Sequence, residues 1–319
     1  MANLFQARKK ASGGMSVDSL TITQMPFKTY YLQNETLDLT GLKVTATAGA
    51  LSGDVSNLIT TQPASGATMS TLGTNTVTIS YGGATTTFNV TVAVVPETLN
   101  DCSWDLIQEL AFAGTLGDYY NEGDTKEITI GANTITMQLA SINDGTGTAG
   151  EYYPNGTADF ISVELLPDTH SMNTTDTNVG GWNDCNMRTY LNNTIYPTLP
   201  SDLRAVIVEK THMRTAGNES YSFVSASDKL WLPTSWEIFE TATFSGESAT
   251  YNKHYSIFSD TSSIIKKRVG FTSANVWWTS SPNVTTSTYF CSVSDSGSVD
   301  RYQTSRSFGV ALCFRIGKS

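Results

Sequence analysis

The chain has 319 residues, a formal net charge of −10 and a sequence pI near 4.7. This length predicts two domains, and the acidic balance argues against a nucleic-acid partner, which would need a basic face. With 39% hydrophobic residues the chain has enough apolar material to fold around a core. No apolar run reaches the roughly 18 residues that cross a bilayer, so no membrane insertion is expected. The first ten residues lack the apolar core of a secretory signal peptide.

The cysteines are too few and too scattered for a zinc site or a disulfide framework, because none forms a C-x-x-C pair. They are Cys102, Cys185, Cys291 and Cys313. Without an export signal we expect all four to be reduced and buried, where a thiol behaves as a small apolar group.

Composition divides the chain into three zones. Residues 1–15 form a short basic arm that ends in Ser-Gly-Gly, a flexible hinge by content. Residues 16–95 are rich in threonine, and no Asp, Glu, Lys or Arg occurs from Val55 through Pro96. Residues 96–319 hold every tryptophan, cysteine and histidine. These zones predict an N-terminal arm followed by two domains.

The middle zone has the period-two pattern of half-buried strands. Apolar and polar residues alternate over 77–81 and again over 88–94, on either side of Gly82-Gly83. Two such runs across a Gly-Gly turn predict a hairpin. With similar runs at 20–22 and 42–46, the zone predicts an all-β sandwich.

A family resemblance supports this fold. The stretch Lys28-Thr29-Tyr30-Tyr31, followed by Glu35 through Ala46, resembles bacterial Ig-like modules of surface and phage proteins. Asn34 stands where a glycine is usual, and asparagine tolerates the left-handed conformation that such a turn requires. Modules of this kind mostly act as spacers, so the resemblance implies a fold and not an activity.

The C-terminal zone predicts a mixture of helices and strands. The first expected elements are a helix from Ser103 to Gly114 and two strands between Ile128 and Leu139. Three more helices are expected: one through Met187 and Leu191, capped by Asn183 or Asp184, one through Leu203 and Ile207, and one that begins at the capping box of Thr234 and Glu237. The chain is expected to end in a strand over 310–316 with one buried face.

These elements carry a second resemblance. Residues 103–114, 123–126, 181–192, 227–233 and 277–282, together with Gly309-Val310, resemble the DUF6273-type domain of bacteria and their phages. Leu232-Pro233-Thr234, Glu237 and the terminal Phe314-Arg315 are also similar to the formylglycine-generating branch of the C-type lectin fold. The resemblance implies an α+β C-type lectin-like domain after the Ig-like sandwich.

Catalysis is not expected. The three histidines (His170, His212 and His254) have no neighbouring Cys, Asp or Glu at triad or metal spacing. The resemblance to formylglycine-generating enzymes implies one alternative, an oxidase that uses Cys291 and Cys313. A reactive cysteine needs an exposed electropositive site, whereas Cys313 lies in an apolar terminal strand.

No cofactor is expected, and calcium is the alternative. Trp182-Asn183-Asp184 spells a tripeptide that lectins of this fold use for calcium and sugar, but here it precedes a predicted helix. The acidic turn Asp144-Gly145-Thr146-Gly147 lacks the spacing of a calcium loop. A calcium site whose oxygen ligands come from distant loops is therefore kept as an alternative.

The segment 275–306 is the predicted ligand-binding part. Trp277 and Trp278 are expected in the core, whereas small polar residues with Tyr and Arg supply adaptable contacts. The variable proteins of diversity-generating retroelements are similar in carrying exchangeable residues at this end of a lectin fold. The predicted ligand face consists of Asn283, Thr285, Thr286, Thr288, Tyr289, Asp295, Ser298, Asp300, Arg301 and Tyr302. They flank the strand 290–293, so we expect them at one edge of the sheet.

The resemblances imply a non-enzymatic phage receptor-binding adhesin, such as part of a tail fibre. Its C-terminal tip would bind a bacterial cell-surface protein or glycan, and the arm around Leu4, Phe5 and Arg8 would anchor it to other virion proteins. Such tips are often homotrimers, which strengthens weak contacts through multivalency. The alternative is a virion decoration protein in which the Ig-like domain binds and the C-terminal domain is structural.

Overall fold

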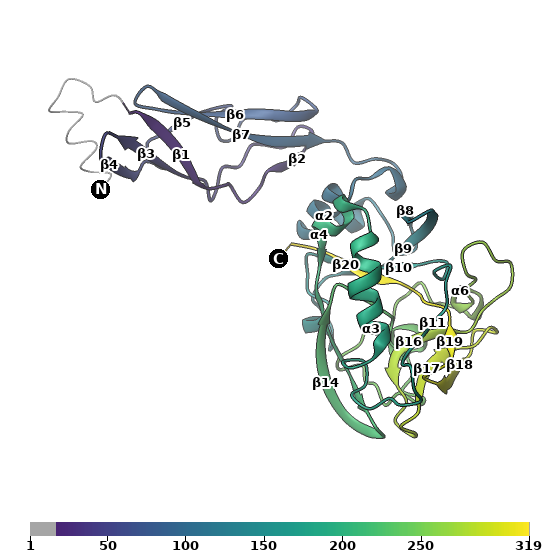
Figure 1. Ribbon diagram of the computed structural model, residues 1–319. Helices are drawn as coiled ribbons and strands as arrows, with labels where there is room; N and C mark the ends of the chain where they lie inside the picture. Colours follow the sequence, from purple (N-terminus) through teal and green to yellow (C-terminus); the bar gives the residue numbers. More distant parts are fainter. Residues whose placement is uncertain (1–16, 319) are drawn as a thin grey trace. The chain divides into compact units, whose positions relative to one another are not determined.

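The computed structural model describes residues 17–318, so the predicted basic arm lies outside the described residues. The chain divides into two compact units, one that ends at Val95 and one that begins at Pro96 (Figure 1). This boundary coincides with the change in composition. No helix among residues 17–318 combines the length and apolar character needed to cross a membrane.

The first unit is a β-sandwich of two sheets. One sheet has the order β1 (Ser19–Gln24), β3 (Lys43–Ala48), β4 (Leu51–Asp54), and the other β2 (Tyr30–Leu32), β7 (Ala84–Ala93), β6 (Gly73–Tyr81), β5 (Thr60–Gln62). The predicted hairpin is confirmed, because β6 and β7 pair antiparallel from Gly73–Val92 to Tyr81–Ala84. Its turn needs two glycines, since Gly82 and Gly83 have φ of 61° and 92°.

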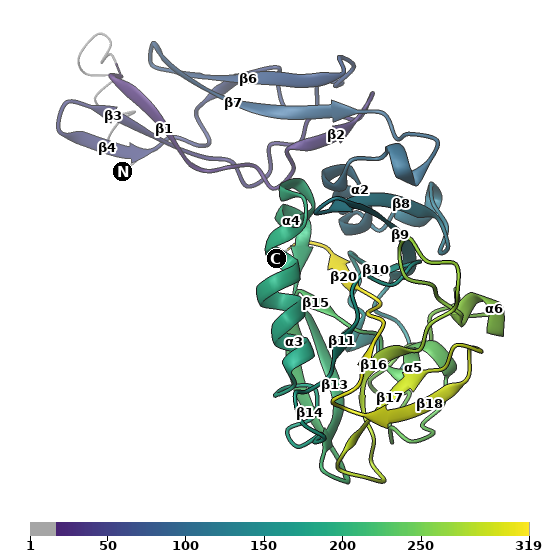
Figure 2. The ribbon, with the colours of Figure 1, turned by 45° about the vertical axis from the view of Figure 1, so that its right-hand side comes forward.

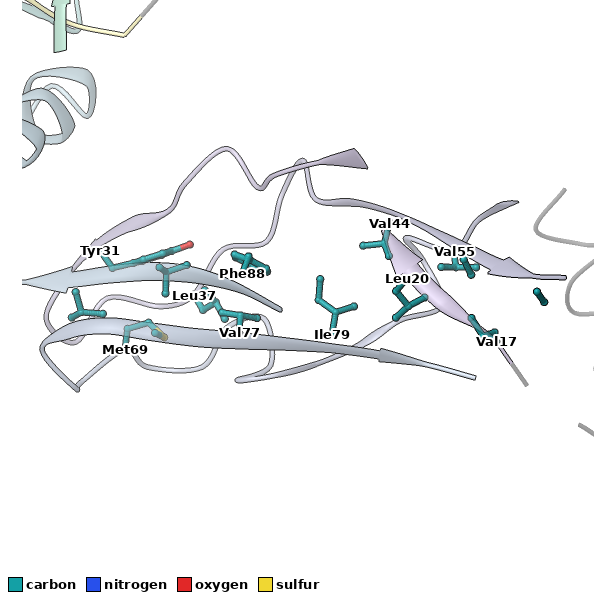
Figure 3. Packing of buried hydrophobic residues seen from close by; sticks show 14 residues of the cluster. Val17, Leu20, Tyr31, Leu37, Val44, Val55, Met69, Val77, Ile79 and Phe88 are labelled. Carbon is teal, nitrogen blue, oxygen red and sulfur yellow. The ribbon is translucent and has the colours of Figure 1, made fainter. Parts of the chain in front are cut away.

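The core of this unit lies between the two sheets (Figure 3). Val44 comes from one sheet and Val77 and Ile79 from the other, and all three are fully buried. The Tyr31 ring is buried with them, and its hydroxyl donates to the carbonyl of Asp38 at 2.9 Å. This bond ties β2 to the following loop.

The second unit is built around a six-stranded sheet. Its order is β12 (Ile207–Val208), β20 (Cys313–Ile316), β10 (Thr157–Ser162), β9 (Asn133–Asn143), β8 (Thr125–Ile130), with β15 (Leu230–Trp231) also paired to β20. Helix α2 (Trp104–Phe112) packs on this sheet through Trp104, whose ring lies 5.3 Å from Phe160 and 5.7 Å from Phe314. The predicted α2 and the strand pair β8–β9 are confirmed.

The other strands form smaller sheets beside the main one (Figures 1 and 2). They are the hairpin β13 (Lys210–Gly217) with β14 (Ser220–Asp228), the sheet β16 (Trp277–Pro282), β17 (Tyr289–Val293), β18 (Val299–Gln303), and the pair β11 (His170–Ser171) with β19 (Ser307–Phe308). The remaining helices are α3 (Asn186–Tyr190), α4 (Ser201–Val206), α5 (Ser235–Phe239) and α6 (Thr261–Ile264). Short turns are η1 (Leu99–Asp101), η2 (Leu116–Asp118), η3 (Gly150–Tyr152), the π-helical η4 (Leu191–Ile195) and η5 (Tyr196–Thr198).

Helix starts follow local capping in most places. The capping box of α5 is confirmed, because the Thr234 hydroxyl accepts from the Glu237 amide and the Glu237 carboxylate accepts from the Thr234 amide. The predicted cap of α3 is wrong. Cys185 occupies that position, and the Asn183 carboxamide donates instead to the Ser225 carbonyl on β14.

Two predicted elements, α4 and the terminal strand β20, differ in the structure from what the sequence predicts. Helix α4 stops at Val206, and Ile207 is extended because it pairs with Ile316 in the main sheet. The terminal strand begins at Cys313 and not at residue 310, and it is buried on both faces and not on one. β20 lies inside the sheet, and Arg315 can be buried there because Asp159 neutralises its charge.

Core predictions for the second unit are confirmed at the aromatic and thiol positions. Trp277 and Trp278 are fully buried. All four cysteines are free and buried, in agreement with the reduced, structural role expected for them.

Candidate ligand-binding surface

The ten predicted ligand residues do not share one edge of the sheet. The loop 283–288 precedes β17 and the turn 294–298 follows it, so the two lie at opposite ends of that strand. Asp295 and Ser298 are therefore separated from Thr285 and Thr286 by the length of β17. The sequence correctly marks both loops as polar, but adjacency to one strand does not bring them together.

Strand β18 divides the remaining predicted residues between its two faces. Successive side chains of a strand point to opposite faces. Arg301 lies 4.1 Å from the Phe244 ring centroid, whereas Tyr302 packs against Phe308 at 4.8 Å between ring centroids. Asp300 shares the Tyr302 face by alternation. The prediction that these three form one contact surface is wrong.

Asn283 belongs to the interior. Its side chain is fully buried, and its Oδ1 accepts from the Thr285 amide at 2.8 Å and from the Thr286 amide at 2.9 Å. This geometry shapes the loop before β17 from within. The predicted role of Asn283 as a ligand contact is therefore corrected to a structural one.

The loop 283–289 is held by Asn178, a residue more than 100 positions away. Its buried Nδ2 lies 2.9 Å from the Asn283 carbonyl, 3.0 Å from that of Thr286 and 2.8 Å from that of Tyr289. Its Oδ1 accepts from the Asn218 amide at 2.7 Å. One side chain thus joins three separate segments at one end of the unit.

The tip of the β13–β14 hairpin fits against Asn178 without spare room. A Cβ at Gly217 would lie 1.9 Å from the Asn178 carbonyl oxygen, and Gly217 has φ of 73°. Only glycine allows this approach. Asn218 and Glu219 follow in the left-handed region, with φ of 52° and 60°. In Figures 1 and 2 this tip reaches the same end of the unit as the loop between β16 and β17.

Side chains that are at least partly exposed lie at this end, and we call them the loop platform: Tyr221, Phe244, Thr285, Thr286 and Arg301. Tyr221 is 64% exposed and Thr285 is exposed, while the other three are half-buried. The Arg301 guanidinium donates to the Thr285 hydroxyl at 3.1 Å while lying over the Phe244 ring. The platform therefore presents a tyrosine and a stacked arginine, which are residue types enriched among interface hot spots, beside two threonine hydroxyls.

Phe244 is strained. It adopts φ of 66°, a left-handed conformation that costs a bulky residue free energy. The Val284 amide donates to its carbonyl at 2.8 Å, which holds the loop 241–247 beside the loop before β17. Strain of this kind tends to occur at ligand-contacting positions.

Thr285, Thr286 and Arg301 of the platform are among the predicted ligand residues, whereas Tyr221, Phe244 and the organising Asn178 are not. The hairpin tip carried a signal, because Gly217-Asn218 is a turn dipeptide between two β-rich runs. The sequence carries no such signal for Phe244 or Asn178, because their roles depend on partners that lie far along the chain.

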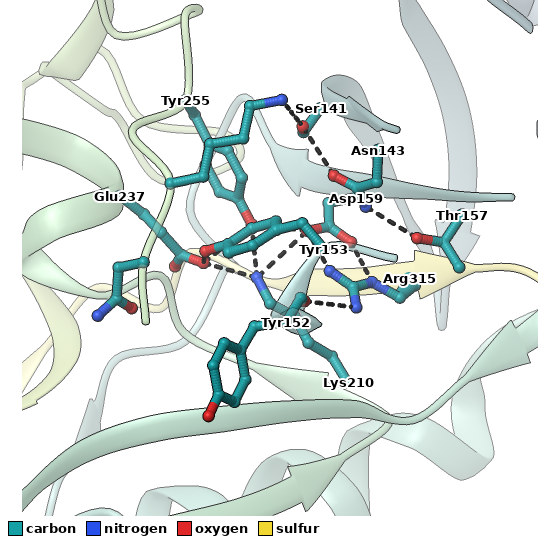
Figure 4. A network of polar contacts seen from close by, with 12 residues as sticks. Ser141, Asn143, Tyr152, Tyr153, Thr157, Asp159, Lys210, Glu237, Tyr255 and Arg315 are labelled. Carbon is teal, nitrogen blue, oxygen red and sulfur yellow. Dashed lines mark hydrogen bonds and ion pairs between the residues drawn. The ribbon is translucent and has the colours of Figure 1, made fainter. Parts of the chain in front are cut away.

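Away from the loop platform, six buried side chains form a polar cluster (Figure 4): Tyr153, Asp159, Lys210, Glu237, Tyr255 and Arg315. Lys210 Nζ lies 3.2 Å from Asp159 Oδ2 and 2.6 Å from Glu237 Oε1. Arg315 pairs with Asp159 through Nε at 2.6 Å and Nη2 at 2.9 Å. The Tyr153 hydroxyl donates to Glu237 Oε1 at 2.6 Å.

The charges of this cluster balance. Burial by itself would raise the pKa of Asp159, but Arg315 and Lys210 outweigh it and hold that pKa below its ordinary value. Burial would also raise the pKa of Glu237, but Lys210 and the hydrogen bonds from Tyr153 and Thr234 together outweigh it and lower that pKa. Two cations and two carboxylates, all inaccessible to solvent, join β10, β13, α5 and β20. We interpret the cluster as structural.

Thiol chemistry has little support from the geometry. Burial raises the pKa of Cys291 and of Cys313 above the ordinary range, and the thiolate is the reactive form of cysteine. His212 is buried, and its pKa is lowered by burial and then by Arg214. Within residues 17–318 no three His, Cys, Asp or Glu side chains are grouped so as to hold a metal ion.

Comparison with solved structures gives a weak likeness. A structure provisionally assigned as a glycoside hydrolase from Bacteroides thetaiotaomicron is similar at 9% identity and a TM-score of 0.16, over 96% of this chain and 83% of that chain. A TM-score this low carries no argument about fold or activity. No curated protein matches the chain.

Family comparison is informative for both units. The bacterial Ig-like domain of group 3 matches residues 24–92, within the first unit. The domain of unknown function DUF6273 matches residues 157–317, about half of the chain and most of the second unit. The chain therefore belongs to the DUF6273 family and carries a bacterial Ig-like domain at its N-terminal side.

Proposed function

We propose that the chain is a non-enzymatic attachment protein whose second unit binds a bacterial cell-surface protein or glycan through the loop platform. The observation that carries this proposal is that two distant segments, the hairpin tip and the loop before β17, both bind Asn178. They do so at the end of the unit where Tyr221, Thr285 and Arg301 are at least partly exposed. Binding residues commonly lie on loops positioned by a rigid framework.

The family resemblances also support a proposal for the particle that carries the protein and for its assembly. The proposed carrier is a phage particle, with the Ig-like unit as a spacer, the N-terminal arm as the anchor and a homotrimer as the assembly. We also propose that the second unit is a variant of the C-type lectin fold. Its early and late strands, β10 and β20, pair in one sheet, which leaves the intervening chain to form the loops.

A second candidate function is a decoration protein that binds through its Ig-like unit. Phe27 is 70% exposed and Met25 is 43% exposed, so that unit presents two apolar side chains for a partner to cover. Binding by a chain without residues 97–319 would favour this candidate.

The test is adsorption of the purified full chain to a panel of bacterial strains. Arg301→Ala should weaken binding by about tenfold or more, as truncation of an interface arginine often does, while its melting temperature stays close to that of the wild type. Asp295→Ala is the matched control, because Asp295 lies in the same segment but outside the platform.

Wild-type binding by Arg301→Ala, or loss of binding in Asp295→Ala alone, would contradict the platform as the contact surface. Failure of the wild type to adsorb to any strain would contradict attachment itself.

A further inference from the structure

The second unit contains a cleft that is separate from the loop platform. It has a volume of about 370 Å³ and is lined from four segments: 144–149, Tyr153, 236–240 and 249–254. A volume of this order is within the range of small-molecule sites. We infer that this cleft, here called the Trp236 cleft, binds a neutral sugar residue.

Trp236 gives the cleft an aromatic wall. The side chain is half-buried, and its indole Nε1 makes no hydrogen bond to any residue between 17 and 318. Its backbone amide donates to Glu247 at 3.0 Å, which fixes the residue in the first turn of α5. An indole combines an apolar face with one hydrogen-bond donor. This combination suits a sugar ring, which has apolar C–H faces and hydroxyls around its rim.

Polar groups surround this wall. Asp144 Oδ1 accepts from the Thr146 amide at 3.0 Å and from its hydroxyl at 2.9 Å, so its second oxygen can accept from a ligand. The exposed Glu240 carboxylate has no partner in the described chain. Lys253 donates to the Ser141 hydroxyl at 2.9 Å and retains further N–H groups. The cleft thus offers both acceptors and donors, as adjacent hydroxyls require.

The cleft is preorganised. Tyr153 lines it on one side and is locked on the other, because its hydroxyl binds Glu237 and its ring lies 4.1 Å from Lys210 Nζ (Figure 4). Glu240 is held at φ of 53°, a strained left-handed conformation at the end of α5. Rigid walls lower the entropic cost of binding a small ligand.

Charge and polarity narrow the class of ligand. Asp144 and Glu240 would repel an anion, whereas the Lys253 ammonium, which also pairs with Glu122 at 3.8 Å, offers donors to hydroxyls. The polar rim would leave unpaired groups against a purely apolar ligand. A neutral polyol with an apolar face fits each of these constraints.

The experiment uses the full chain and a panel of neutral hexoses, N-acetylhexosamines and their disaccharides, observed by saturation-transfer NMR and tryptophan fluorescence. At least one sugar should bind saturably. Trp236→Ala should lower its affinity by about tenfold or more, and Glu240→Gln by a smaller factor. Glu209→Gln, at an exposed carboxylate outside the cleft, is the control and should leave the affinity unchanged.

The result is independent of cell attachment. Arg301→Ala should still bind the sugar, even if its adsorption to cells is lost. The inference is overturned if no sugar in the panel binds, if Trp236→Ala binds like the wild type with an unchanged melting temperature, or if Arg301→Ala alone abolishes sugar binding.

Discussion

Glu247 shows how one residue can make the stability of the second unit depend on pH. Its carboxylate is 3% exposed and accepts from the Trp236 amide at 3.0 Å and from the Ser281 hydroxyl. Both donors are neutral. Burial is the main cause that raises the pKa of Glu247 from 4.5 to about 7, against the smaller opposing effects of these hydrogen bonds.

The direction in which stability changes with pH follows from the proton that the folded state retains. Between pH 4.5 and about 7 the folded state keeps a proton that the unfolded state releases, so stability is full below this window and falls as the pH rises through it. The loss is on the order of 3 kcal/mol. Glu247→Gln should remove this dependence, because the amide cannot ionise.

Urea unfolding of wild type and Glu247→Gln at acidic and mildly alkaline pH measures the effect. The variant should gain stability relative to the wild type as the pH rises, whereas Glu209→Gln, at an exposed carboxylate, should not. A stability difference between wild type and Glu247→Gln that stays constant across pH would disprove the assignment.

At the scale of elements, the end of the second unit that carries the loop platform depends on contacts between loops more than on the strands themselves. The tip of β13–β14 and the loop before β17 each bind Asn178. Each strand pair would keep its ladder without that residue. The relative position of the two loops, however, has no comparable support from their own sequences.

Asn178→Ala should therefore destabilise the unit and disorder its platform. The substitution leaves buried carbonyls of the loop before β17 and the Asn218 amide without their partner, which should cost about 3 kcal/mol or more. Thermal melts measure the loss, and amide hydrogen exchange should rise in residues 283–289.

Asn193→Ala is the control, since Asn193 is exposed on the helical segment after α3. Protection of residues 283–289 that is unchanged in Asn178→Ala would show that the strands alone position the loop.

At the scale of the whole molecule, the buried cluster around Lys210 connects segments that are far apart in sequence. Asp159, Lys210, Glu237 and Arg315 come from β10, β13, α5 and β20, and each side chain is at most 3% exposed. A charge in such a place is tolerated only with its partners. The cluster therefore makes the folding of the second unit cooperative across these elements.

Lys210→Met should cost about 3–5 kcal/mol, because Glu237 then keeps its charge in the interior without a cation. Lys28→Met removes a surface ion pair of 2.9 Å whose side chains are more than one third exposed, and it should change stability by less than about 1 kcal/mol. Chemical denaturation compares the two. Equal losses would refute the structural role of the cluster.

The sequence by itself determined the elements whose causes are local. The β6–β7 hairpin follows from alternation around Gly82-Gly83, α5 from the capping box at Thr234, and the division near Pro96 from composition. The burial of Trp277 and Trp278 follows from their size and apolar character. These features depend on neighbours within a few residues, which a linear pattern records.

Only the tertiary structure decided which polar residues are accessible and which side chains meet. Asn283 and Thr285 belong to the same polar run, yet one is buried and the other exposed. Arg301 and Tyr302 are adjacent but lie on opposite faces of β18, and the Trp236 cleft combines segments more than 80 residues apart. Such contacts are set by strand pairing and chain topology, and residue type in a loop carries no information about either.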